Sequence, residues 1–116
     1  MLLDERDAAH LWDMREAARD CIEFVLDSTY EGFCTDRMMH SAVERRLETL
    51  GEAAGRVSEG FQSSHPETPW KEIKGIRLAL AHRYGEVNLH ELWRTVRNDL
   101  PDLLPKLDAL IPSMEG

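Results

Sequence analysis

The chain has 116 residues, of which 42% are hydrophobic and 31% charged, and its formal net charge is −8 at pH 7. This length suits a single domain with a true hydrophobic core, and this composition argues against intrinsic disorder. The N-terminus is too acidic for a signal peptide, and no apolar run approaches the ~18 residues that cross a bilayer. Cys21 and Cys34 show neither disulfide nor metal-ligand spacing. We therefore expect one soluble, cytoplasmic domain over residues 1–116, without a membrane partner.

Two long helices are predicted in the first half of the chain. Apolar residues at helical spacing indicate a first helix from about Asp4 to Thr29, and Gly32 is the expected break after it. Thr35 or Asp36 can cap a second helix. Its apolar residues step alternately by four and three positions, which predicts a buried seam made of Val43, Leu47, Leu50, Ala54 and Val57.

A loop and a third helix are expected next. Residues 60–69 contain a glycine, three serines or threonines and two prolines, which is typical of a loop. Thr68 followed by Pro69 is a start signal for a helix, with Thr68 as the cap, and Gly85 is the expected end. The buried side of this helix is predicted to consist of Trp70, Ile73, Ile76 and Leu80.

The last part of the chain predicts a fourth helix and a short final segment. Asn88 with Glu91 three residues later resembles a capping box, and Pro101 is expected to interrupt the helix. Apolar residues continue beyond the proline at Leu103, Leu104, Leu107 and Leu110. No alternating strand pattern is present. The predicted fold is all-α, an up-and-down bundle of four main helices with a short broken C-terminal helix.

The residues best suited to chemistry stand between positions 77 and 84, which read Arg-Leu-Ala-Leu-Ala-His-Arg-Tyr. An imidazole such as His82 can move protons near neutral pH, and a guanidinium such as Arg77 can stabilise a phosphate that gains charge in the transition state. Together they are a minimal set for cutting RNA without a metal. The chain has no Cys/His cluster, glycine-rich phosphate loop or nucleophile elbow, so we expect neither a metal nor a cofactor.

Charge distribution gives weak support for a nucleic-acid substrate. Phosphate binding normally requires a basic surface, and the chain as a whole is acidic. Residues 1–60 hold 14 Asp or Glu against 7 Lys or Arg, whereas residues 74–97 hold five basic and two acidic residues. The motif therefore lies in a locally positive part of the sequence, an imbalance that a solvated helix face could also produce.

Helix geometry suggests that one copy of the motif is not enough. At ~100° per residue, Tyr84 shares a helix face with Arg77, but His82 lies ~140° away from Arg77. A straight helix does not aim both catalytic groups at one phosphate. Either the helix unwinds near Gly85 or a second copy of the chain completes the site, and we favour a two-fold dimer with both motifs along one cleft.

The spacing Arg77, four residues, His82, one residue, Tyr84 resembles the motif of the HEPN superfamily, in particular that of the HepT toxins of MntA–HepT toxin–antitoxin systems. Residues 42–54 are similar to that family's second helix, residues 69–77 to its approach to the motif, and residues 87–101 to its closing helix. The likeness extends from the first helix to about Leu104.

This resemblance implies a HEPN-like helical domain that acts as a dimeric, metal-independent endoribonuclease and toxin. Arg77 and His82 would be the catalytic pair, with RNA as the substrate. Tyr84 would be the residue to which the cognate MntA-like nucleotidyltransferase antitoxin adds AMP, and the toxin dimer could assemble further with that antitoxin. The added AMP would place bulk and negative charge two residues from His82, where substrate phosphate must bind.

Two other hypotheses stay open at the level of sequence. The family usually has a polar residue, most often asparagine, directly after the motif arginine, and this chain has Leu78. The chain could therefore be a catalytically inactive HEPN binding partner of a nucleotidyltransferase. A generic helical interaction protein with a fortuitous motif is the third hypothesis.

Overall fold

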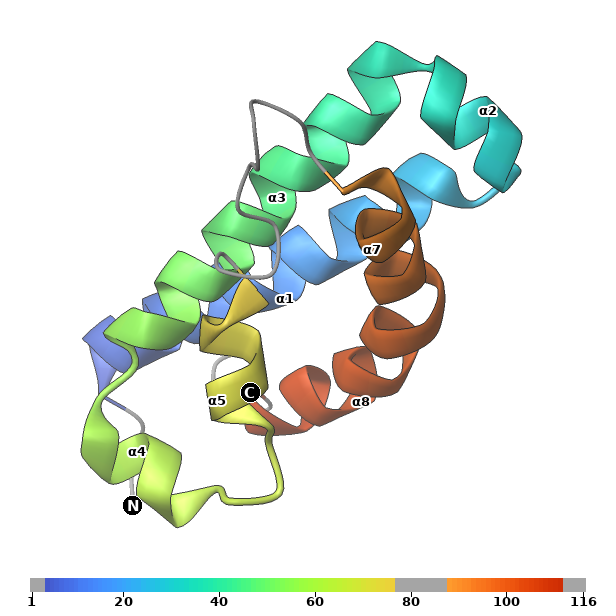
Figure 1. Cartoon of the computed structure of the whole chain (residues 1–116). Coiled ribbons are helices and arrows are strands. Elements are labelled where there is room, and N and C mark those ends of the chain that lie inside the picture. Colours follow the sequence, from blue (N-terminus) through green and yellow to red (C-terminus); the bar gives the residue numbers. More distant parts are fainter. Residues whose placement is uncertain (1–3, 77–87, 112–116) are drawn as a thin grey trace.

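The computed structural model describes residues 4–76 and 88–111, and these form an all-α fold without strands, as predicted (Figure 1). The helices of the first half are α1 (Glu5–Val25), α2 (Tyr30–Thr35), α3 (Arg37–Arg56), α4 (Glu59–Ser64) and α5 (Trp70–Lys74). Those of the second half are α7 (Leu89–Arg94), the π-helix η1 (Thr95–Asp99) and α8 (Leu100–Leu110). None of these described helices has the length and hydropathy needed to cross a bilayer.

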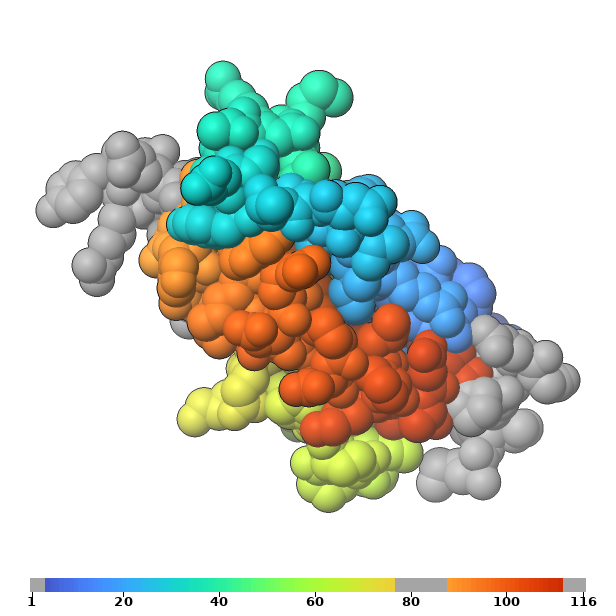
Figure 2. All heavy atoms as spheres, turned by 90° about the vertical axis from the view of Figure 1, so that its right-hand side faces the viewer, coloured from blue at the N-terminus to red at the C-terminus, as the bar shows by residue number. Residues whose placement is uncertain are grey.

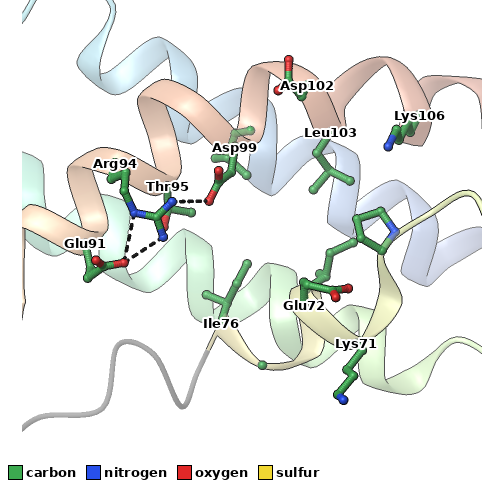
Figure 3. Close-up of a pocket in the computed structure, with 14 residues that line it drawn as sticks. Lys71, Glu72, Ile76, Glu91, Arg94, Thr95, Asp99, Asp102, Leu103 and Lys106 are labelled. Atoms are coloured by element: carbon green, nitrogen blue, oxygen red, sulfur yellow. Dashed lines mark hydrogen bonds and ion pairs between the residues drawn. The ribbon is translucent and has the colours of Figure 1, made fainter.

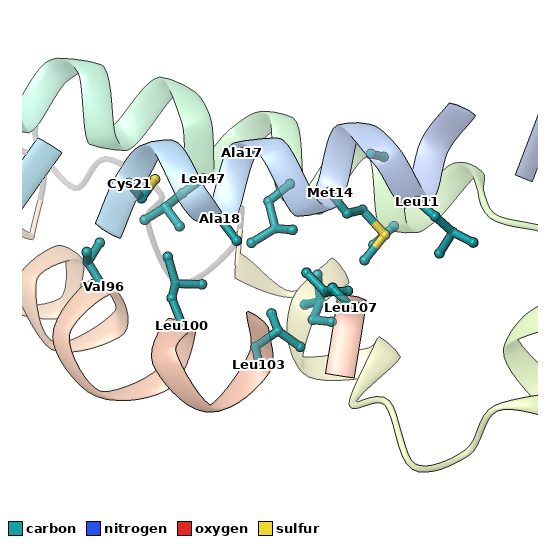
Figure 4. Close-up of a cluster of buried hydrophobic side chains, with 14 of the residues drawn as sticks. Leu11, Met14, Ala17, Ala18, Cys21, Leu47, Val96, Leu100, Leu103 and Leu107 are labelled. Atoms are coloured by element: carbon teal, nitrogen blue, oxygen red, sulfur yellow. The ribbon is translucent and has the colours of Figure 1, made fainter. Parts of the chain in front are cut away.

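The framework of the fold is the pair of long helices α1 and α3, which run side by side in opposite directions (Figure 1). The predicted seam of α3 is confirmed, because Val43, Leu47, Leu50 and Ala54 are fully buried and Val57 is 3% exposed. The facing residues of α1 are also buried, namely Leu11, Met14, Ala17, Ala18 and Cys21 (Figure 4). Small residues on both helices allow this close packing.

The connection between α1 and α3 differs from the prediction. The first helix ends at Val25, and Gly32 lies inside the short helix α2 instead of ending α1. The reason is local: Thr29 Oγ1 accepts a hydrogen bond of 3.0 Å from the Gly32 N–H and so caps a new helix. A Cβ at Gly32 would lie 3.2 Å from Ser28 Oγ, a close contact that a small movement of the serine side chain would relieve. Asp36 caps α3 through the Met39 N–H, as one of the two predicted alternatives.

The predicted loop over residues 60–69 is wrong in its first half, because α4 occupies Glu59–Ser64. Ser58 caps this helix, and Asp7 of α1 accepts hydrogen bonds from the Ser58 N–H (2.8 Å) and hydroxyl (2.6 Å).

The prediction that Thr68 caps the next helix is also wrong. Pro69 occupies the cap position of α5, and the Thr68 hydroxyl is buried without a hydrogen-bond partner in the described part of the chain.

The C-terminal helix begins as predicted but does not break at Pro101. Asn88 accepts a hydrogen bond from the Glu91 N–H and caps α7, although the Glu91 carboxylate binds Arg94 instead of completing a capping box. The five-residue π turn η1 precedes Pro101, and the Leu100 N–H bonds to the Thr95 carbonyl. Pro101 then falls in the first turn of α8, where its missing N–H and its ring are tolerated.

The segment from η1 to α8 covers the face of α1 that α3 leaves open (Figures 1 and 4). Its buried residues are Val96, Leu100, Leu103, Leu107 and Leu110. Among the predicted buried residues of the third helix, Trp70 and Ile73 are buried and Ile76 is half-buried. Leu80 and the expected helix end at Gly85 lie outside the described residues.

Candidate functional site

The motif residues Arg77, His82 and Tyr84, and also Leu78, lie outside the described residues, so their arrangement stays a prediction. The structure does describe the two points between which the motif segment runs. Ile76 follows α5 and directly precedes Arg77 in the chain, and Asn88 caps α7 directly after the segment. The surroundings of these two points therefore define the candidate site.

A pocket of about 620 Å³ lies between α5 and the C-terminal helix, and its lining includes Ile76 and Glu91, which is three residues after Asn88 (Figure 3). Ile76 from the α5 side and Leu103 from α8 point into it. The apolar part of the lining is Pro69, Ile73, Ile76, Leu100 and Leu103. Its charged part comprises the cations Lys71, Arg94 and Lys106 and the carboxylates Glu72, Glu91, Asp99 and Asp102. This volume is in the range that holds a small molecule or a nucleotide.

Arg94 is the best-fixed charged group of the pocket. Its guanidinium is 2.8 Å from Glu91 Oε2 and 3.4 Å from Asp99 Oδ2 (Figure 3). The ion pair with Arg94 lowers the pKa of Glu91 and raises the pKa of Arg94. Asp99 is five residues after Arg94, and the π turn between them brings residues at this spacing to one face. Two carboxylates thus neutralise Arg94, so the pocket is not a ready-made phosphate site.

The excess of basic residues over residues 74–97 gives less net positive charge on the surface than the sequence predicts. Of its described basic residues, Arg94 is neutralised by Glu91 and by Asp99, which lies just beyond the stretch. Arg97 stands over the ring of Trp93, 5.0 Å from its centre. The Lys74 ammonium donates a hydrogen bond of 3.0 Å to the neutral side chain of Gln62, and it forms no ion pair with the described carboxylates.

Aromatic contacts fix α7, and with it the return point of the motif segment, to α2. The ring centres of Trp93 and Phe33 are 5.2 Å apart, and those of Tyr30 and His90 are 6.0 Å apart in an edge-to-face arrangement. Figure 2 shows α2 packed directly on α7. The sequence pattern did not predict α2, and therefore missed this support; Thr29 at a cap position was the signal that could have found it.

The cysteines and the acidic groups give no second chemical centre. Cys21 is buried beside the Val43 carbonyl, and burial raises the pKa of its thiol to about 12. A neutral thiol of this kind packs the core and does not act as a nucleophile. Within residues 4–76 and 88–111, no three His, Cys, Asp or Glu side chains are grouped so that they could hold a metal ion.

Comparison with known proteins assigns the chain to a family. The family model described as "Ribonuclease HepT-like" matches residues 14–110. This chain is a member of the HepT-like ribonuclease family. The match extends from the middle of α1 to the last residue of α8, and so it includes all of α3, the pocket and the motif segment.

Relatives of this HepT-like chain carry ribonuclease names. A Methanocaldococcus jannaschii protein with the name "Putative RNase MJ1380" is 36% identical over 93% of this chain and all of its own length. The Thermococcus cleftensis protein named "probable ribonuclease HepT" is 38% identical over 87% of this chain and 92% of its own. A Caldanaerobacter subterraneus protein with the name "Putative RNase TTE0752" is 38% identical over 78% of this chain and 80% of its own length. No solved structure gives a significant match.

Proposed function

We propose that this HepT-like chain is a metal-independent endoribonuclease that works as a homodimer and serves as the toxin of a toxin–antitoxin pair. The observation that carries the proposal is membership of a ribonuclease family together with the motif formed by Arg77, His82 and Tyr84. The pocket supports it, because its lining includes Ile76, the residue that directly precedes Arg77 in the chain.

The proposed reaction uses the RNA itself as the nucleophile. His82 removes the proton from a ribose 2′-hydroxyl, and the 2′-oxygen attacks the adjacent phosphorus. Arg77 stabilises the charge that develops on the phosphate oxygens. The P–O bond to the 5′-oxygen breaks, and a protonated imidazole gives a proton to that oxygen. One histidine cannot be base and acid at once, so the dimer would supply His82 from each subunit.

Cleavage by the purified protein tests the catalytic assignment. Wild-type protein should cut single-stranded RNA in the presence of a chelator, whereas His82→Ala and Arg77→Ala should lose about 10²-fold or more of the rate. Circular dichroism should show the same helix content for all three proteins. Equal rates for wild type and His82→Ala would exclude the catalytic pair, and loss of wild-type activity with the chelator would exclude metal independence.

Mixing subunits tests the dimer. Wild-type and His82→Ala chains are combined at fixed total concentration and allowed to exchange. If a cleft needs a histidine from each subunit, activity should fall with the square of the wild-type fraction. A linear fall would show that each subunit cuts RNA alone, and sedimentation of the protein as a monomer would exclude the proposed dimer directly.

The proposed control of the toxin is the addition of AMP to Tyr84 by an MntA-like nucleotidyltransferase. Co-expression with such an enzyme should add AMP to Tyr84, detected by mass spectrometry of the peptide, and should abolish RNA cleavage. Tyr84→Phe is the matched control, because it removes only the acceptor hydroxyl. Neutralisation of Tyr84→Phe to the same extent as wild type would exclude this mechanism.

A second candidate function follows from Leu78, which stands where the family usually has a polar residue. The chain would then be an inactive binding partner of the nucleotidyltransferase. This function predicts a stable complex with that enzyme but no RNA cleavage by unmodified protein. Restoration of cleavage by Leu78→Asn would show that the leucine is the cause.

A further inference from the structure

A second, smaller hollow lies between the C-terminal half of α3 and α5. Its volume is about 400 Å³, and its lining consists of Gly51, Glu52, Gly55, Arg56 and Lys74. In contrast to the pocket described above, cations outnumber carboxylates here by two to one. A Cβ added at Gly55 would meet no atom within 4 Å, so the helix surface beside the two cations is open.

Lys74 is held in a definite position in this hollow. Its Nζ donates a hydrogen bond of 3.0 Å to Gln62 Oε1. The amide nitrogen of Gln62 in turn donates to the Val57 carbonyl at 2.8 Å and to the Ala54 carbonyl at 3.3 Å. Ala54 lies in the last turn of α3 and Val57 is its C-cap residue, and carbonyls at a helix end have unfilled acceptor capacity. The side chain of Gln62 therefore links the end of α3 to the ammonium group of Lys74.

This arrangement orients a cation without neutralising it. Arg19, Arg46 and Arg94 each lie within ion-pair distance of a carboxylate. Lys74 instead bonds to an uncharged amide oxygen, and Arg56 has no ion pair within residues 4–76 and 88–111. An oriented but uncompensated cation is the group that binds a phosphodiester most favourably, because no carboxylate has to be displaced.

The hollow also has the right place in the chain for a substrate contact. Lys74 is the last residue of α5, two residues before Ile76 and three before Arg77. A strand of RNA that reaches the motif segment passes residues close to its ends. A phosphate one or more nucleotides from the scissile bond can therefore bind in this hollow while another binds at the motif.

We propose that Lys74 binds a backbone phosphate of the RNA substrate, that Arg56 is the second cation of this subsite, and that Gln62 is the positioning residue for Lys74. The inference rests on the proposed ribonuclease function. It goes beyond that function by assigning a binding subsite outside the Arg77–Tyr84 motif. Because the contact is to phosphate, the subsite contributes affinity and positioning but no base specificity.

The test is RNA binding as a function of salt. The probe is a fluorescent single-stranded oligonucleotide with 2′-O-methyl groups, which cannot be cut, so binding is measured whether or not the protein is catalytic. Lys74→Gln should weaken binding and reduce the slope of log K against log salt concentration by about 0.7, the value for one lost phosphate contact on a single strand. Gln62→Glu should do the same, because a carboxylate in place of the amide neutralises Lys74.

Arg45→Gln is the matched control. Arg45 is 79% exposed on α3, and its loss changes the net charge by the same amount as either test variant. This control should keep the wild-type slope of log K against log salt concentration.

Gln62→Ala tests the positioning role separately. It removes the hydrogen bond that orients Lys74 but adds no charge, so it should weaken RNA binding while leaving the slope nearly unchanged. Thermal unfolding of each variant shows whether it is folded, and Lys74, as an exposed residue, can be replaced without loss of packing.

Three outcomes would overturn the inference, and they can be told apart. Slopes for Lys74→Gln and Gln62→Glu equal to that of Arg45→Gln would remove the subsite but leave the ribonuclease proposal intact. AMP binding is measured for the same variants. If Lys74→Gln binds AMP more weakly than wild type but binds RNA equally well, the hollow is a site for the phosphate of a free nucleotide. Absence of RNA binding by the wild type would overturn the proposed function, and the subsite with it.

Discussion

The α1–α3 framework and the flank formed by α5, α7 and η1 are built in opposite ways. The framework contacts consist of fully buried apolar side chains such as Leu11 and Leu47. The flank contributes residues to both hollows, includes the half-buried Ile76, and holds both ends of the motif segment. Burial of the apolar framework side chains stabilises the fold, whereas the flank cations Lys74 and Arg94 are exposed to solvent.

The two cations nearest the motif show a second difference within the flank itself. Lys74 precedes the motif and is held by an amide, whereas Arg94 follows it and is held by two carboxylates. Both are positioned, but only the first keeps its charge available. A count of basic residues along the sequence therefore overestimates the positive surface, because some of those cations are paired with carboxylates that cancel their charge.

The largest expected effect is in thiol reactivity, and it separates the framework from α2, the helix that packs on α7. Cys21 lies in the framework with a pKa of about 12, whereas Cys34 is half-buried on α2. Near neutral pH, the thiolate fraction of Cys21 should be lower than that of an ordinary thiol by on the order of a thousandfold. Mass spectrometry after iodoacetamide treatment should find Cys34 labelled and Cys21 labelled only in urea. Equal labelling of both in native buffer would show that the framework opens.

Truncation of a framework side chain should cost far more stability than truncation in the flank. Leu47→Ala should lower the free energy of unfolding by about 2–5 kcal/mol, since it leaves a cavity at a fully buried position. Ile76→Ala removes a half-buried side chain that already lines a pocket, and should cost much less. Urea unfolding measures both. Similar losses for the two variants would contradict the division of roles.

The contact between Asp7 and Ser58 should have an intermediate effect. Asp7→Ala removes the acceptor of both the N–H and the hydroxyl of Ser58, and should lower the free energy of unfolding by about 1–3 kcal/mol. Asp13→Ala, at an exposed position of the same helix, is the control and should have little effect. If the two variants unfold at the same urea concentration, α4 is not held to α1 in this way.

The ion pair of Arg94 should contribute least and should depend on pH. Because Arg94 lowers the pKa of Glu91 in the folded state, the pair stabilises the fold above the ordinary pKa of a glutamate. This stabilisation should disappear as the pH falls through the lowered pKa. The difference in unfolding temperature between wild type and Arg94→Gln should therefore be small at pH 7 and smaller still at pH 3. A difference that grows on acidification would contradict the proposed linkage.

The long helices and their seams could be predicted from sequence because burial enforces a strict apolar period, as at Val43 and Leu47. The short helices α2 and α4 were missed, since each contains a glycine and begins at a single hydrogen bond that the side chain of its cap residue, Thr29 or Ser58, accepts. The motif was visible as spacing. The contacts of Arg94 and Lys74 were not, because they depend on Asp99 and Gln62, which come together with them only through a π turn and a tertiary contact.

The π turn at Thr95–Asp99 has a consequence for the alignment of this chain with its relatives. A π turn is an α-helix with one residue inserted, so deletion of Arg97 should restore a regular helix rather than break it. The π turn absorbs the extra residue, so Leu92 and Leu100 are both buried although they lie eight residues apart. After the deletion they would lie seven residues apart, which at ~100° per residue leaves them within ~20° of the same helix face. A gap of one residue at this point of an alignment is therefore compatible with the same buried core.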